Sequence, residues 1–143
     1  MRISDVLRTK GSEVATLTAD ATVAELLSGL AAHNIGAMVV LDESGVAGIV
    51  SERDVVRHLH AQGAGLLDQP VRTIMSEVRV QCAPTDVVNS LAGLMTTHRV
   101  RHVPVVDNGR LAGIVSIGDV VKNRMEELEA EQEHLHAYIS QGG

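Results

Sequence analysis

The sequence predicts an α/β (α+β) fold: two tandem β-α-β-β-α repeats packed as one pseudo-two-fold module, with a C-terminal helical extension. Three observations predict it. The phrases GIVSERDVV and GIVSIGDVV begin at Gly48 and Gly113, 65 residues apart. The same succession of strand-type and helix-type apolar patterns surrounds both phrases. A chain of 143 residues also has room for two small repeats that share one core.

The offset of 65 residues holds without a gap well beyond these two phrases. It pairs His33 with His98 and Asp42 with Asp107. A coincidental match would not keep register for so long, and we therefore infer an internal duplication. One copy alone, at about 60 residues, would bury too little surface to be comfortably stable. We therefore expect the two copies to pack against each other.

Each copy should open with a short strand and a one-sided helix, whose apolar residues recur at intervals of three and four. The unbroken apolar run that follows is typical of a strand buried on both faces. A turn and a further strand come next, and a Ser-x-x-Asp motif then opens the second helix. The expected strands are 14–17, 37–41 and 47–50, then 79–82, 103–107 and 112–115, with the first helices starting near Thr22 and Asp86.

The repeats set the expected domain boundaries. We assign repeat 1 to residues 1–62, a Gly-rich linker to 63–70, repeat 2 to 71–124 and the helical extension to 125–143.

The second helix of repeat 2 should run far beyond the repeat. Apolar side chains continue at alternating spacings of four and three, with Gln132 as one polar interruption: Val121, Met125, Leu128, Leu135 and Ile139. Such a helix could pack back on its own module or could form a dimer contact. Because two repeats leave little free surface for so long a helix, we favour a homodimer.

The composition excludes several classes of function. Apolar residues make up 45% of the chain, yet Phe and Trp are absent and Tyr138 is the one aromatic residue. Nucleic-acid bases would therefore find no aromatic platform, and the net charge of −6 opposes binding to nucleic acid or anionic membranes. The lone Cys82 makes no internal disulfide, and no apolar run is long enough for a membrane helix. These features predict a cytoplasmic protein.

Several phrases carry a family resemblance. GIVSERD and GIVSIGD hold equivalent places, HNIGAMVV and HRVRHVPVV precede the second strands, and ISDVLRTKG and VRTIMSE open the copies. Together they resemble the CBS-domain pair, or Bateman module, and specifically the stand-alone proteins that consist of little besides the two repeats. The resemblance covers essentially the whole chain. It implies a cleft between the repeats that binds an adenine nucleotide.

The Ser-x-x-Asp motifs are the chemical centre of this expectation. Ser51 and Ser116 leave a strand where a helix begins, and the free N–H groups and positive end of a helix favour anions. Asp54 and Asp119 follow in the first helical turn, where a carboxylate can accept hydrogen bonds from the two hydroxyls of a ribose. Taken alone, each motif is also a plain capping box, in which the Asp bonds back to the Ser backbone. The resemblance favours the ribose role.

The resemblance extends the site to the starts of the second strands, whose backbones frame the adenine and whose basic side chains reach phosphates. Because the basic residues of repeat 2 have no basic counterpart in repeat 1, we expect Arg101 and His102 to serve chiefly the nucleotide at Asp119. Lys10 is expected at the same site, and Lys10 and Arg53 could alternatively be solvated surface charges. The expected ligand-binding residues are Lys10, Val14, Ala15, Ile35, Gly36, Ala37, Ser51, Arg53, Asp54, Val100, Arg101, His102, Ser116, Ile117 and Asp119.

The predicted function is that of a non-catalytic regulatory sensor. AMP or NAD is the expected ligand, and ATP, ADP or S-adenosylmethionine is a less favoured one. Binding would shift the module between conformations. An enzyme is disfavoured because no phosphate-binding Walker loop, nucleophile–base pair or metal-ligand cluster is evident. The histidines are expected to be structural and to bind no metal. A structural adaptor with degenerate ligand sites is the main alternative.

Overall fold

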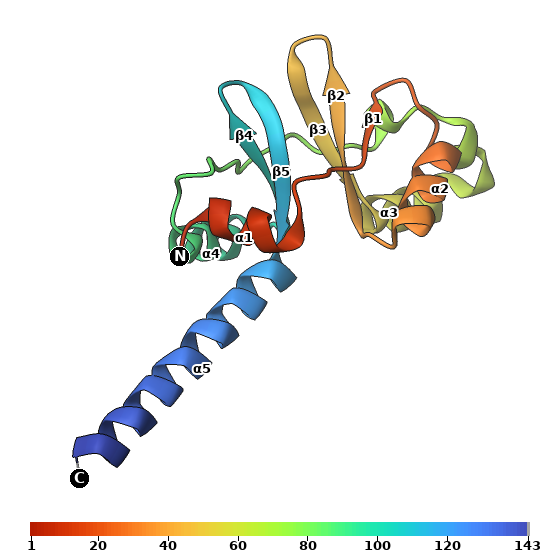
Figure 1. Ribbon diagram of the computed structural model, residues 1–143. Coiled ribbons are helices and arrows are strands. Elements are labelled where there is room, and N and C mark those ends of the chain that lie inside the picture. The colour runs from red at the N-terminus through yellow and green to blue at the C-terminus, as the bar shows by residue number, and fades with distance from the viewer. Residues whose placement is uncertain (143) are drawn as a thin grey trace.

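The computed structural model describes residues 1–142, and it folds into a body of two β-hairpins flanked by helices, from which one long helix projects (Figure 1). An N-terminal helix, α1 (Ile3–Lys10), precedes repeat 1, which contains β1 (Thr16–Thr18), α2 (Val23–His33), β2 (Ala37–Asp42), β3 (Gly45–Ser51) and α3 (Glu52–Gln62). Two short 3-10 turns follow, η1 (Gly63–Asp68) and η2 (Val71–Thr73). Repeat 2 contains α4 (Val88–His98), β4 (His102–Asp107), β5 (Arg110–Ser116) and α5 (Ile117–Gly142).

The sheets confirm the duplication predicted from the sequence. Strand β2 pairs antiparallel with β3, and β4 pairs antiparallel with β5. The register of each hairpin shifts at the same place, after Val40 in repeat 1 and after Val105 in repeat 2. The two hairpins lie side by side, with β3 in contact with β5 (Figure 1). This contact joins the repeats at the strands that lead into the Ser-x-x-Asp turns.

The first strand forms in repeat 1 but not in repeat 2, where the strand expected at 79–82 is wrong. Strand β1 pairs parallel with β2, and Leu17 lies opposite Val40. In repeat 2 this pairing shrinks to one parallel bridge between Cys82 and Val105. Proline has no N–H, so Pro104 cannot donate the hydrogen bond that would extend the pairing from Cys82 back toward Val80.

Two apolar clusters form the core, and each draws on a segment from outside its own repeat. Ile3 and Val6 of α1 pack among the buried residues of repeat 2, including Leu91 and Val103. The cluster of repeat 1 is completed by Leu66, Val71 and Ile74. The fully buried Leu66 lies in η1, so the segment expected to be a plain linker is part of the packed body. Helix α1 and the segment 66–74 therefore hold the two repeats together through apolar contacts.

The helix ends agree with the sequence signals. The side chain of Thr22 caps α2 by accepting a hydrogen bond from the Glu25 N–H. Helices α2 and α4 end at His33 and His98, and the next residues, Asn34 and Arg99, adopt left-handed backbones with φ of 51° and 55°. These sharp turns direct the chain from each helix into β2 or β4. Cys82 is buried as predicted, and burial raises the pKa of its thiol to about 12.

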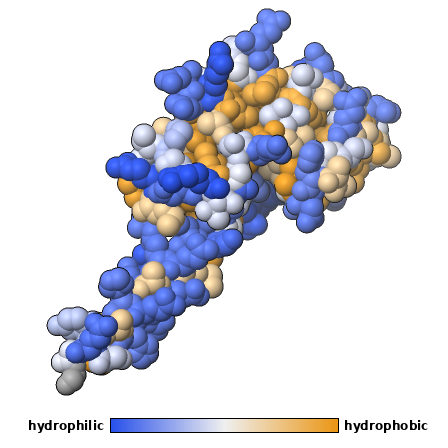
Figure 2. Space-filling view, in the orientation of Figure 1, coloured by the Kyte–Doolittle hydropathy of each residue, from blue (hydrophilic) through white to orange (hydrophobic). Residues whose placement is uncertain are grey.

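The C-terminal extension is helical, as predicted, and it runs continuously from repeat 2 within α5. Val120 and Asn123 are buried against the body, whereas every residue from 128 to 142 is exposed. Figure 2 shows broad hydrophobic areas on the visible face of the body and a mainly hydrophilic projecting helix with separate apolar spots. Gly143 lies outside the described residues.

Candidate functional site

A cavity of about 470 Å³ opens where the start of α3 meets the start of β4. This volume falls in the range of small-molecule sites, about 300–1,000 Å³. Both repeats and the segment between them line it: Gly36, Ala37, Ile49, Ser51, Glu52, Arg53, Asp54, Arg57, Ser76, Glu77, Val78, Arg79, Val80, His98, Arg99, Val100, Arg101, His102 and Pro104. A ligand here would touch both repeats at once.

One acidic group of this cavity is the carboxylate of Asp54 in the first turn of α3. Its Oδ2 atom accepts hydrogen bonds from the Ser51 N–H at 2.8 Å and the Ser51 hydroxyl at 3.1 Å, and the Ser51 hydroxyl also caps the Asp54 N–H. The capping-box interpretation is therefore correct for this motif. It does not use the whole carboxylate, because Oδ1 receives no hydrogen bond within residues 1–142. One acceptor oxygen remains for a ligand.

Besides Arg53 and Arg57 on α3, the cavity has a second basic wall. It begins where α4 ends and the left-handed Arg99 turns the chain into β4. Five arginines line the cavity, and within residues 1–142 none of them forms an ion pair: Arg53, Arg57, Arg79, Arg99 and Arg101. Glu52, Glu77 and Asp54 are the carboxylates of the lining. The cavity therefore has an excess of positive charge, and the N-terminus of α3 adds to it.

His102 lies at the centre of this arrangement, close to Gly36 of the other repeat. A Cβ atom at Gly36 would lie 3.8 Å from the imidazole Cε1 of His102. Burial lowers the pKa of His102, Lys10 and Arg101 lower it further, and Asp119 and Glu52 oppose them. The imidazole is therefore held neutral near pH 7, where it offers one donor and one acceptor.

The second Ser-x-x-Asp motif has a different environment. Asp119 Oδ2 accepts hydrogen bonds from the Ser116 N–H at 2.8 Å and from Lys10 Nζ at 2.5 Å. The ammonium of Lys10 also donates to the Ile114 carbonyl at 2.8 Å. Burial raises the pKa of Asp119, but the Lys10 and Ser116 hydrogen bonds and the Lys10 charge outweigh it, so this pKa is lowered overall. The carboxylate is ionised and already has a cationic partner.

A smaller cavity of about 320 Å³ adjoins this ion pair between α1 and α5. Its lining residues are Met1, Asp5, Val6, Arg8, Thr9, Lys10, Asp119, Lys122, Asn123 and Glu126. Among the predicted residues it contains Lys10 and Asp119, which the sequence had placed together.

The start of β4 adjoins the Ser116–Asp119 turn as well as the larger cavity: His102 is the strand partner of Ser116, and the Arg101 carbonyl accepts a hydrogen bond from the Ile117 N–H at 2.8 Å. Arg101 and His102 both line the cavity of Ser51 and Asp54, and Asp119 is not part of that lining. The assignment of Arg101 and His102 chiefly to a nucleotide at Asp119 therefore stays a prediction.

The other expected site residues divide into two groups. Gly36, Ala37, Arg53 and Val100 line the larger cavity with those named above. Val14, Ala15, Ile35, Ser116 and Ile117 line neither cavity.

The expected ligand-binding residues did not include Ile49, Glu52, His98, Arg99 and Pro104 of the larger cavity. They also left out one wall, the segment from Ser76 to Val80, and the helical residue Arg57. Two signals could have found them. Adding the repeat offset of 65 to the expected residues Val14 and Ala15 gives Arg79 and Val80. Arg57 lies four residues after Arg53, on the same face of a helix.

Within residues 1–142, no three His, Cys, Asp or Glu side chains gather as a metal-binding group. No helix in that part of the chain combines the length and the apolar character needed to cross a bilayer.

Fold and site together define a tandem-repeat α/β module with a cation-rich cavity between its repeats, the class of protein predicted from the sequence. The family model for the CBS domain matches residues 3–61 and again residues 71–126, and the chain belongs to this family.

Relatives cover nearly the whole chain. The CBS domain-containing protein CBSX3, mitochondrial, of Arabidopsis thaliana is 37% identical over 150 residues, which span 99% of this chain and 72% of the relative. The crystal structure of a CBS-domain containing protein from Agrobacterium tumefaciens matches with a TM-score of 0.82 and 46% identity, covering 87% of this chain and 99% of that one. A CBS domain protein from Pyrobaculum aerophilum, complexed with AMP, matches with a TM-score of 0.74 and 32% identity over 83% of this chain and 89% of its own.

Proposed function

We propose that this protein is a non-catalytic sensor of adenine nucleotides and that the cavity of Asp54 is its principal ligand site. The observation that carries the proposal is that one cavity of about 470 Å³ contains the Asp54 carboxylate, whose Oδ1 accepts no hydrogen bond within residues 1–142, and five arginines that form no ion pair within the same residues. A nucleotide needs both features, because its ribose hydroxyls donate to a carboxylate and its phosphate accepts from arginines.

In the proposed complex the ribose hydroxyls donate to Oδ1 of Asp54. The phosphate lies near Arg99 and Arg101, within the field of the α3 N-terminus. The cavity offers no aromatic platform, so the adenine would lie among Ile49, Val78 and neighbouring backbone groups. AMP fits this arrangement best, and the relative from Pyrobaculum aerophilum supports it. NAD, ATP and ADP would use the same contacts, whereas the cationic sulfonium of S-adenosylmethionine suits the arginines less well.

Regulation would follow from the position of the cavity between the repeats. A ligand that contacts α3 of one repeat and β4 of the other stabilises one relative arrangement of the two. A homodimer would pass this shift to a second subunit, and we propose a homodimer because apolar side chains are exposed on α3, α4 and α5, including Val56, Leu94 and Met125. We propose the cytoplasm as its location, from the composition and the buried thiol.

The test is isothermal titration of the purified protein with AMP, NAD and adenosine. Asp54→Ala should weaken AMP binding at least tenfold, because a ribose acceptor is lost, while the matched variant Asp119→Ala should have little effect. Equal losses in the two variants would refute the assignment of the principal site. Undetectable nucleotide binding by the parent protein would favour a structural adaptor.

A further inference from the structure

Helix α5 carries an apolar row that no part of the described chain covers. Met125 and Ile139 are 56% and 60% exposed, and Val121, Leu128 and Leu135 are exposed as well. The helix contacts the body through Val120 and Asn123. Successive helical residues are about 100° apart, so a row that begins at Val121 points away from the face that packs on the body. The body therefore cannot cover this row without a break in the helix.

The row has the spacing of a coiled-coil seam. With Met125 at position a of a heptad, Gln132 and Ile139 also occupy a, and Val121, Leu128 and Leu135 occupy d. Leucine at d is common in two-stranded coils. A single polar residue at an a position, here Gln132, can pair with its own copy and fix the register.

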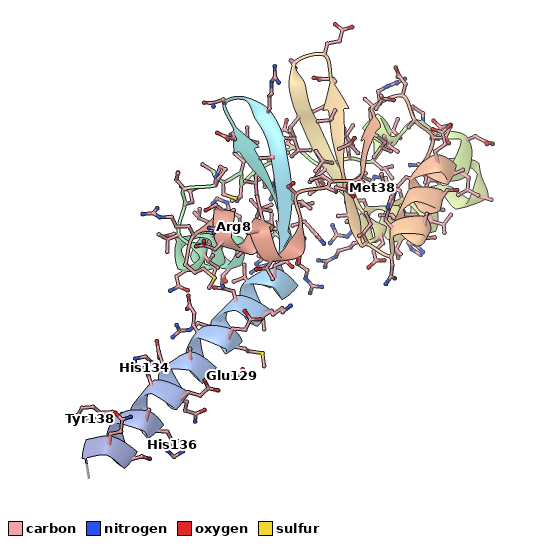
Figure 3. The ribbon with its side chains drawn as sticks, in the orientation of Figure 1. Arg8, Met38, Glu129, His134, His136 and Tyr138 are labelled. Atoms are coloured by element: carbon pink, nitrogen blue, oxygen red, sulfur yellow. The ribbon has the colours of Figure 1, made fainter. Side chains whose placement is uncertain are left out.

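The charges beside the seam select a parallel partner of the same sequence. In a parallel in-register pair, each g residue faces the e residue five positions later on the other helix. Arg124 then faces Glu129 of a second copy, and Glu131 faces His136. Figure 3 shows Glu129 and His136 projecting from the free part of α5 into solvent. An antiparallel pair over the same length would place Glu129 beside Glu129 and Glu131 beside Glu131, which repel.

We propose that residues 121–139 of α5 form a parallel, two-stranded coiled coil with the same segment of a second copy of this chain. The inference deepens the proposed homodimer and does not depend on the nucleotide site. The family model ends at residue 126, so most of this contact belongs to the part of the chain outside the CBS repeats. The two bodies would then lie at the same end of the coil, because the free part of α5 leads away from the body (Figure 1).

Disulfide trapping tests the orientation in the full-length protein. Met125→Cys and Leu135→Cys, each combined with Cys82→Ala, should form self-linked dimers under mild oxidation. Ala130→Cys, on the outer face of the helix, is the matched control and should remain largely unlinked. When the first two variants are mixed and allowed to exchange, self-linked dimers should still predominate. Predominant cross-links between position 125 and position 135 would overturn the parallel arrangement, as would efficient linking through position 130.

Charge reversal tests the proposed pairing independently. Glu129→Arg places like charges at two contacts of the dimer, and the dissociation constant measured by sedimentation should rise about three- to tenfold. Adding Arg124→Glu should restore it, and failure of the double variant to recover would overturn the pairing. A parent protein that is monomeric at micromolar concentration would overturn the coil itself. The AMP affinity of Glu129→Arg should match that of the parent protein. The experiment therefore tests the coiled coil independently of the nucleotide site.

Discussion

The two Ser-x-x-Asp turns have the same local structure and different surroundings. Each carboxylate bonds back to the N–H of its serine at 2.8 Å. Asp54 lines a cavity with five arginines that form no ion pair within residues 1–142, whereas Asp119 forms an ion pair with Lys10 of α1. The duplicated motif therefore fixes the geometry of the turn, and we propose that non-duplicated residues decide which turn binds a ligand. The predictions below test this difference.

The largest expected effect concerns the phosphate contact in the Asp54 cavity. Arg101→Ala should weaken AMP about ten- to a hundredfold and adenosine little, because a hydrogen bond to a charged group contributes roughly 1.5–3 kcal/mol. Calorimetric titration with the two ligands measures the difference. Arg110→Ala, on β5 and outside the cavity lining, is the control. Equal weakening of AMP and adenosine would mean that Arg101 supports the strand and does not contact the phosphate.

Substitution of two equivalent glycines by alanine should have a smaller effect, on the stability of the fold. A Cβ at Gly48 would lie 2.8 Å from the backbone oxygen of Ser76, which lines the Asp54 cavity. A Cβ at Gly113 would meet only the flexible side chain of Leu7, at 2.6 Å. Gly48→Ala should therefore lower the free energy of unfolding by about 1–2 kcal/mol, and Gly113→Ala by less, in urea denaturation. The opposite ranking would show that the backbone near Ser76 yields more easily than Leu7.

The smallest effect concerns the Lys10–Asp119 ion pair. The pKa of Asp119 is lowered on folding, so the pair stabilises the fold above pH about 4, and this contribution is lost as the pH falls through the lowered value. Lys10→Met should therefore cost less than about 1 kcal/mol at pH 6, since both side chains are partly exposed, and less again at pH 3. Denaturation at the two pH values measures the change. A constant difference across this range, or the same pH dependence in an Asp119→Asn background, would contradict the assignment.

The sequence predicted the features that depend on local pattern. The repeat offset located both hairpins, and the Ser-x-x-Asp spacing located the openings of α3 and α5. The strand predicted at 79–82 does not form. Pro104, which is distant in sequence, lacks the N–H that would donate one of the hydrogen bonds between the two strands. The assignment of Arg101 to one of the two sites stays a prediction. The start of β4 pairs with Ser116 of its own repeat and also lines the cavity of Asp54 in the other, and no local pattern encodes this second neighbourhood.

The most direct test of the account is a crystal structure of the protein with one molar equivalent of AMP. The account predicts density for AMP in the larger cavity, with the ribose at Asp54, the phosphate near Arg99 and Arg101, and the Lys10–Asp119 ion pair intact. Density for AMP at Asp119, with Lys10 displaced and the larger cavity unoccupied, would contradict it.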